Sequence, residues 1–335
     1  MHLVILAEKA VPGQSIAITT QPSETTAMSV AYITHSACRR HDMGEYHPEQ
    51  PARLDAINDR LIASQLMLFL QHHDAPKATR EQLLRVHDQH YVDQVFELSP
   101  EEGPEWLDGD TAMNPYTLRA ALHAAGAAVK AVDLVLTGSS RTAFCAVRPP
   151  GHHAERARGM GFCFFNNVAV GAAHALAEHG LQRVAIVDFD VHHGNGTEDI
   201  FSGNPQVLCC STFQHPFYPY SGSDSHVHNI INVPLAAGTD GAAFRQAVTE
   251  RWLPALHEYE PQLILISAGF DAHREDDMGQ MNLLEFDYAW VTSQLVEVAR
   301  RHSAGRIVST LEGGYHLLAL ARSVNAHIES LMGDG

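Results

Sequence analysis

Two carboxylates and one imidazole stand two residues apart along the chain, at Asp188, Asp190 and His192. They follow the apolar run of residues 184–187, which predicts a buried strand of a parallel sheet. Side chains two residues apart in an extended chain point to the same face, so we expect these polar groups to converge at the carboxyl end of that strand. Ligands bind at this edge of open α/β sheets, and this set of groups would suit a cation.

A catalytic metal site needs a third protein ligand, and Asp271 could supply it. Asp271 follows Gly269 at the end of another predicted strand, so it would reach the same edge of the sheet as Asp190 and His192. Three protein ligands with one open position are typical of catalytic rather than structural zinc. An isolated Asp-x-His pair is more often a hydrogen-bonded turn, but several polar strand ends together favour a metal site. Its oxygen ligands would also suit iron(II), cobalt(II) or manganese(II).

Two adjacent histidines, His152 and His153, follow the stiff Arg-Pro-Pro segment at residues 148–150. Asp188 and Asn195 are available as partners, one for each imidazole. A histidine oriented by a carboxylate is the usual arrangement for proton transfer. The alternative is a pair of ordinary loop histidines bonded to backbone carbonyl groups.

Another predicted strand ends in the segment Glu312-Gly313-Gly314-Tyr315. Two glycines let the backbone approach a ligand closely, and the phenol of Tyr315 could then stabilise an oxyanion. The alternative is a glycine turn followed by a packed aromatic ring. The aromatic side chains within residues 161–167 are open to two interpretations, the lining of a channel or part of the core.

Predicted strands and helices alternate along the chain, which is typical of an α/β fold whose mostly parallel sheet carries helices on both faces. Strands are predicted at residues 30–34, 143–147, 183–187, 207–211, 229–233, 262–267 and 306–311. Helices are predicted from residue 54 and over residues 115–136, 167–179, 239–259, 284–302 and 317–332. No repeat or linker interrupts this pattern, so we expect one domain over residues 29–335, preceded by a loosely attached leader at residues 1–28.

The composition narrows the class of protein. The 335 residues are 45% hydrophobic, enough for a sizeable core. There are 39 acidic and 22 basic residues, and the formal charge of −17 disfavours nucleic acid as a partner. No apolar run approaches the roughly 20 residues of a membrane span, and we expect no secretory signal in the first residues. Five cysteines without a CxxC pair indicate a reducing compartment, so we expect a cytoplasmic protein.

Taken together, the motifs resemble the zinc-dependent histone deacetylase family, which includes acetylpolyamine amidohydrolases and is related to arginase. The resemblance extends from about residue 31 to about residue 332, and Asn195 and Glu312 make the chain most similar to bacterial class II members. It implies the arginase/deacetylase fold with about eight strands. The motifs that carry it lie at residues 148–155, 161–167, 188–197, 267–272 and 311–315.

The resemblance also implies roles for the polar residues. One zinc ion per chain would be held by Asp190, His192 and Asp271. His153 resembles the general base, which Asn195 would orient. His152, paired with Asp188, resembles its electrostatic partner. Tyr315 resembles the donor to the oxyanion.

Two further sites follow from the same resemblance. An acyl tunnel would be lined by Gly161, Phe162, Tyr218, Met278 and Gly313. The family usually has phenylalanine where this chain has Tyr218, which makes the tunnel more polar. A structural potassium ion would be held by Asp188, Asp190, His192 and Ser211.

The implied activity is removal of acetyl or short acyl groups from the ε-amine of lysine in proteins or peptides, with release of acetate. The alternative substrate is an acetylpolyamine. Polyamine-specific members carry glutamate where this chain has Met278, which favours acetyl-lysine, although Glu275, Asp276 and Asp277 could still attract a polyamine. No nucleic acid or membrane partner is expected, and homo-oligomerisation is left open.

Two hypotheses from other functional classes remain. An arginase-like enzyme with two manganese ions would need further carboxylates where Gly194 and His273 lie. A catalytically inactive acyl-lysine binding module would have no need of His152, His153 and Tyr315, which this chain retains.

Overall fold

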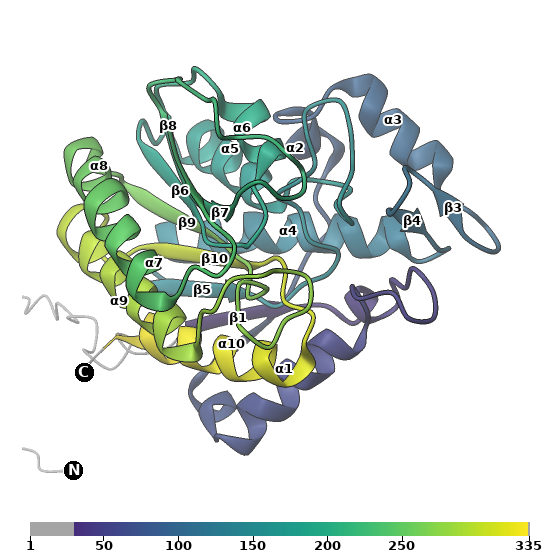
Figure 1. Cartoon of the computed structure of the whole chain (residues 1–335). Coiled ribbons are helices and arrows are strands. Elements are labelled where there is room, and N and C mark those ends of the chain that lie inside the picture. Colours follow the sequence, from purple (N-terminus) through teal and green to yellow (C-terminus); the bar gives the residue numbers. More distant parts are fainter. Residues whose placement is uncertain (1–29, 334–335) are drawn as a thin grey trace, which may run out of the picture.

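A computed structural model describes residues 30–333, so the predicted leader at residues 1–28 lies outside the described residues and the domain boundary stays a prediction. One sheet of eight parallel strands organises the described chain (Figure 1). Its order is β2-β1-β5-β10-β9-β6-β7-β8. The strands are β1 Val30–Thr34, β2 Gln71–Asp74, β5 Thr142–Cys145, β6 Val184–Asp188, β7 Val207–Gln214, β8 Ile230–Leu235, β9 Leu263–Ala268 and β10 Ile307–Leu311.

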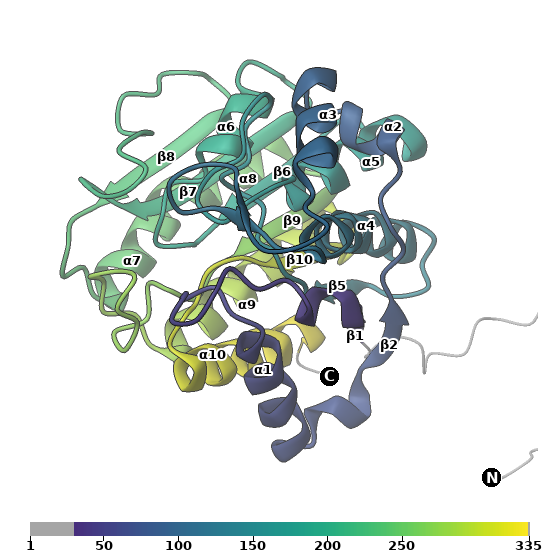
Figure 2. The same cartoon turned by 90° about the vertical axis from the view of Figure 1, so that its right-hand side faces the viewer.

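Helices cover both faces of this sheet, as Figures 1 and 2 show. One face carries α4 and α5, with α2 packed on α5, and the other carries α1, α9 and α10. The helices are α1 Ala52–Ala63, α2 Arg80–Leu84, α3 Gln89–Leu98, α4 Thr117–Leu136, α5 Asn167–His179, α6 Asn195–Phe201, α7 Gly241–Ala247, α8 Leu253–Tyr259, α9 Glu285–His302 and α10 Leu317–Met332. The predicted single α/β domain is therefore confirmed for the described residues.

The inner strands are mostly apolar and buried because both of their faces are covered. Every residue of β6 and β9 is buried. On one face, α4 and α5 approach closely: a Cβ on Gly171 of α5 would lie 3.2 Å from the Cβ of Ala128 on α4. The small residues that predicted a long helix at 115–136 thus serve its packing.

Some elements differ from the prediction. Strand β2 and the short antiparallel pair β3 (Glu105–Trp106) and β4 (Ala112–Met113) were not predicted, because their sequences lack a clear alternation of apolar and polar residues. The predicted helix over 239–259 is divided by a π-helical turn at Val248–Trp252. Pro254 follows this turn and has no backbone N–H for a regular helical hydrogen bond.

The carboxyl ends of the central strands meet at one edge of the sheet, as expected. Asp188 is the last residue of β6 and pairs in register with Ser211 of β7 and Ser267 of β9. The strand ends there, so Asp190 and His192 lie in the loop beyond it. The strand alternation expected for all three polar residues therefore applies only to Asp188, and the loop brings the other two back to the same edge.

Candidate active site

Asp190, His192 and Asp271 form a buried cluster beyond the ends of β6 and β9. The Nδ1 atom of His192 lies 3.0 Å from Oδ1 of Asp190 and 3.2 Å from Oδ2 of Asp271. Backbone amides hold the other carboxylate oxygens: Gly313 donates to Oδ2 of Asp190 at 2.9 Å, and Val191 donates to Oδ1 of Asp271 at 2.9 Å. The remaining oxygen, Oδ2 of Asp271, is buried without a hydrogen bond from any described residue.

The charges of this cluster fit a metal cation. Within the described residues, no lysine or arginine forms an ion pair with Asp190 or Asp271. Burial and the neighbouring charge of Asp190 raise the pKa of Asp271 to about 7. Two buried carboxylates and one imidazole, with one carboxylate oxygen left without a hydrogen bond, form a set of ligands that a divalent ion would fit.

Glycine is required beside this cluster. A Cβ on Gly313 would lie 2.0 Å from Oδ2 of Asp271 and 2.5 Å from Oδ2 of Asp190, so a side chain there would displace the proposed ligands. Gly269 is similarly placed, with its Cβ position 2.0 Å from Oδ2 of Asp190. Gly313 was predicted to line the tunnel, but the structure places it behind the two carboxylates.

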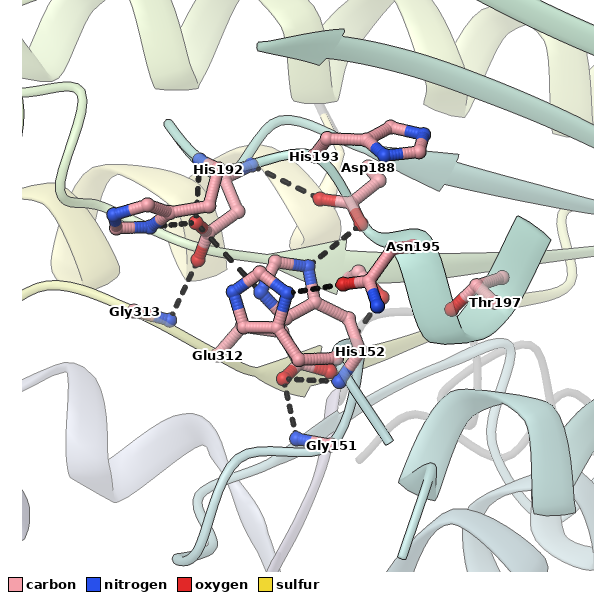
Figure 3. A network of polar contacts seen from close by, with 12 residues as sticks. Gly151, His152, Asp188, His192, His193, Asn195, Thr197, Glu312 and Gly313 are labelled. Carbon is pink, nitrogen blue, oxygen red and sulfur yellow. Dashed lines mark hydrogen bonds and ion pairs between the residues drawn. The ribbon is translucent and has the colours of Figure 1, made fainter. Parts of the chain in front are cut away.

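The adjacent histidines have different partners. His152 Nδ1 lies 2.9 Å from Oδ2 of Asp188, and His153 Nδ1 lies 2.7 Å from Oδ1 of Asn195, the first residue of α6. Figure 3 shows Asp188, Asn195 and Glu312 gathered around His152. Both pairs are buried, so their hydrogen bonds are shielded from water.

These partners give the two imidazoles opposite tendencies. Burial disfavours a charged His152, but the carboxylates of Asp190 and Asp188 outweigh it and raise the pKa of His152 to about 10. Burial, with His152 and His192 close by, lowers the pKa of His153 well below its ordinary value. One imidazole thus favours the cationic form and the other the neutral form.

Glu312 and Arg53 form hydrogen bonds with backbone groups of the loops that carry the site residues. Glu312 Oε2 accepts hydrogen bonds from the backbone N–H groups of Gly151 (2.6 Å) and His152 (3.1 Å), which fixes the loop that carries the histidines. Arg53 of α1 donates to the carbonyl groups of Glu312 and Gly314, at 2.6 Å for the latter. Arg53 also donates to Oε1 of Glu49, four residues earlier, at 3.0 Å. Sequence analysis missed Arg53 because the two carbonyl groups that link it to the site are about 260 residues away.

A pocket of about 280 Å³ opens onto His153 and His192. Its apolar walls include Phe162, Phe217 and Met278. Gly161 has φ +56° and lies against the ring of His153, where an added Cβ would lie 2.5 Å from Cδ2. The complete lining is Asp110, His153, Gly161, Phe162, His192, Phe217, Tyr218, Asp277, Met278 and Tyr315.

The predicted tunnel residues other than Gly313 therefore share one pocket. Asp110 and Phe217 were missed in the sequence, because each lies in a loop whose path is decided by tertiary packing. Met43 and Ala112 were also missed, and they pack around Phe162 in a small apolar cluster. Burial raises the pKa of Tyr315 well above its ordinary value, so its phenol stays protonated and can donate a hydrogen bond.

Ser211 of β7 pairs in register with Asp188 of β6. Its Oγ atom is buried and has no hydrogen-bond partner among the described residues. A cavity of about 10 Å³ lies here, lined by Asp188 and Ser211 among others. An unpaired hydroxyl beside a buried carboxylate fits a small cation.

A second group with metal-ligand chemistry lies away from the sheet edge, between α4 and α5. The Nε2 atoms of His174 and His179 each lie 2.8 Å from Oδ1 of Asp133. Arg85 lies 3.3 Å from Nδ1 of His174, and an arginine can only donate, so Nε2 carries the proton that Asp133 accepts. Ordinary hydrogen bonds therefore account for this cluster.

The family model of the histone deacetylase domain matches residues 47–331. The chain belongs to the histone deacetylase family. The resemblance expected from the motifs is thus confirmed.

Relatives within the histone deacetylase family include enzymes of two kinds. A histone deacetylase-like amidohydrolase of Pseudomonas aeruginosa is 39% identical over 294 residues, covering 86% of this chain and 77% of the relative. The polyamine deacetylase HDAC10 of Homo sapiens is 39% identical over 310 residues, covering 88% of this chain and 46% of the relative. The crystal structure of the HDA15 HD domain matches with a TM-score of 0.86 and 35% identity, covering 91% of this chain and 90% of that domain.

These relatives support assignment of the chain as a hydrolase of the histone deacetylase family. No helix among residues 30–333 has the length and apolar character needed to cross a membrane.

Proposed function

We propose that this chain is a zinc-dependent deacetylase that removes acetyl or another short acyl group from the ε-amine of lysine in a protein or peptide. The observation that carries the proposal is one pocket lined by His153, His192 and Tyr315, of which His192 also joins Asp190 and Asp271 in the buried cluster. A general base, a hydrogen-bond donor and a metal-ligand group would then all face one substrate carbonyl.

The residues divide the work as follows. A zinc ion held by Asp190, His192 and Asp271 would supply positive charge that polarises the amide carbonyl and lowers the pKa of water. His153 accepts a proton from the water that adds to the carbonyl carbon. Tyr315 donates a hydrogen bond to the oxygen that becomes negative.

The carbon–nitrogen bond then breaks. The leaving amine takes a proton from an imidazolium, and acetate and the free amine are the products. His152, held by Asp188, contributes a nearby positive charge that favours the negatively charged intermediate. Asn195 holds the ring of His153 in place through Nδ1.

We also propose a structural potassium ion beside Asp188 and Ser211. Ser211 Oγ would be one ligand, and Asp188, Asp190 and His192 would provide the others. The unpaired hydroxyl of Ser211 supports this assignment.

The residues that line the pocket bear on the choice of substrate. Met278 lines the pocket where polyamine-specific relatives carry glutamate, which favours acetyl-lysine. A specific observation favours the second candidate, an acetylpolyamine: the two charged side chains of the lining other than histidine are Asp110 and Asp277, both acidic. A human relative is itself named a polyamine deacetylase.

A substrate panel tests the proposal. The purified chain with added zinc is assayed on acetyl-, propionyl- and trifluoroacetyl-lysine peptides and on N-acetylputrescine, with Tyr315→Phe as the comparison. We expect the highest kcat/KM on an acyl-lysine peptide, and a loss of roughly 100-fold or more in the variant, as for other oxyanion donors. Faster turnover of N-acetylputrescine would overturn the substrate, and no turnover of any amide would overturn the reaction.

A further inference from the structure

Asp276 lies in the loop five residues beyond Asp271, and its side chain is buried, at 4% exposure. Among residues 30–333, no basic side chain forms an ion pair with it, although a buried carboxylate needs strong partners. Its partners are three backbone N–H groups. Oδ2 accepts from Tyr315 at 2.6 Å and from His316 at 2.9 Å, and Oδ1 accepts from Met278 at 3.0 Å.

Two of those three donors belong to residues whose side chains line the pocket, Tyr315 and Met278. The third, His316, is the N-cap of α10, so the carboxylate also stands at the positive end of that helix. One side chain therefore ties two parts of the pocket wall, which lie 37 residues apart in sequence, to the start of a 16-residue helix.

The position of the Tyr315 phenol depends on the hydrogen bond between its backbone N–H and Asp276. No described side chain or backbone group forms a hydrogen bond with its hydroxyl, so the ring is oriented by its backbone and by packing. The packing includes Arg53, whose Cζ lies 4.8 Å from the ring centroid, and Phe162, whose ring centroid lies 6.0 Å away and which belongs to the small apolar cluster described above. A shift of the Tyr315 backbone would move the hydroxyl without any bond to hold it.

We propose that Asp276 is a positioning residue that sets the place of the Tyr315 hydroxyl and of the Met278 side chain in the pocket. This inference rests on the proposed function, in which Tyr315 donates to the substrate oxyanion. Asp276 does not touch the substrate, so its effect on the rate passes through Tyr315. Misplacing a reacting or stabilising group by about 1 Å can cost on the order of 100-fold in rate.

The test is a double-mutant cycle with trifluoroacetyl-lysine peptide, whose reactive carbonyl keeps slow variants measurable. D276A should lower kcat about 10-fold or more, whereas D276N, which retains an acceptor for Tyr315 and His316, should lose less. D276A in the Y315F background should lower kcat by less than about threefold, because a positioning residue has nothing left to position. The displacement of Met278 should appear as a change in KM.

Asp240 provides the matched control, because it accepts a hydrogen bond from Ala243 N–H at 3.0 Å as the N-cap of α7, away from the pocket lining. Asp240→Ala should leave kcat within twofold. Equal fold losses from D276A with and without Tyr315, or an unchanged kcat, would overturn the inference. Unfolding of both Asp276 variants at the assay temperature, seen by circular dichroism, would also overturn it by assigning Asp276 to stability alone. An inactive wild-type chain would instead refute the proposed function.

Discussion

His153 Nδ1 lies 2.7 Å from the side-chain oxygen of Asn195, and this neutral partner leaves the imidazole without a direct negative charge. A carboxylate at position 195 would favour the imidazolium and raise the pKa of His153. The base would then become protonated at a higher pH, so we expect the acid limb of kcat/KM in Asn195→Asp to move to higher pH by about one unit.

The experiment needs one compensating change. Asn195 Nδ2 donates to Glu155 Oε1 at 2.6 Å, so a second carboxylate there would be repelled. Asn195→Asp is therefore combined with Glu155→Gln, and Glu155→Gln alone serves as control. Asn195→Ala should instead lower kcat by about 10- to 100-fold, the usual range for a partner that orients an active-site histidine. An acid limb that stays in place in the double variant would contradict the assignment of His153 as base.

Asp271→Asn should abolish tight zinc binding and activity, because the buried cluster then loses one of its two carboxylates. In the wild-type chain, zinc at 100 times its Kd should add about 2.7 kcal/mol to the free energy of unfolding. Chelation and zinc readdition, followed by metal analysis and thermal unfolding, measure both effects. Asp133→Asn is the matched control, since hydrogen bonds account for its cluster. Loss of zinc from Asp133→Asn with retention in Asp271→Asn would contradict the assignment, because the metal would then bind at the Asp133 cluster.

Asp277→Asn should weaken binding of cationic substrates. Asp277 lines the pocket and is exposed, so we expect its charge to act on the flexible part of the substrate rather than on the reacting amide. We expect KM for N-acetylputrescine to rise severalfold with kcat nearly unchanged, and the effect to shrink at high salt. Asp59→Asn on α1 is the control for net charge. A KM that responds equally in both variants would show that the whole surface, and not the pocket, attracts the substrate.

His327 should make the fold sensitive to acid. Its ring nitrogens lie 2.6 Å from Thr292 Oγ1 and 2.8 Å from Ser309 Oγ, and burial lowers its pKa to about 3. The unfolded chain protonates this imidazole below its ordinary pKa of about 6.5, whereas the folded chain does not, so its contribution is fully present above that pH and is lost as the pH falls toward 3. From pH 6.5 to pH 5 the loss is about 2 kcal/mol.

Urea unfolding at pH 8 and pH 5 measures this contribution. His327→Gln should be destabilised at pH 8 and should lose about 2 kcal/mol less than the wild type between the two values. His72→Gln, which changes an exposed histidine of β2, should keep the wild-type difference. The same acid loss in His327→Gln and in the wild type would assign the effect to other groups.

The order of strands and helices was largely readable from the sequence, because buried parallel strands are continuous apolar runs and their connecting helices have a different period. Strand β6 and helix α5 lie within one residue of their predicted bounds. The edge strand β2 could not be predicted in this way, since its Gln-His-His-Asp sequence contains no apolar residue and its pairing with β1 depends on tertiary contacts. The strand alternation expected through His192 was also wrong, because β6 ends at Asp188.

The sequence by itself determined which residues could do chemistry, because side-chain type and local spacing are properties of the chain: Asp190 with His192, His152 with His153, and the glycines before Tyr315. The side-chain types and spacing alone left their partners open, and the tertiary structure decided them. It brings Asp188 to His152 and Asn195 to His153, as the resemblance implied. It also sets Gly313 against the two carboxylates, outside the pocket lining, and brings the carboxylate of Asp276 to the backbone N–H of Tyr315. These contacts join residues tens to hundreds of positions apart. Their geometry depends on how eight strands align at one edge, which no local spacing encodes.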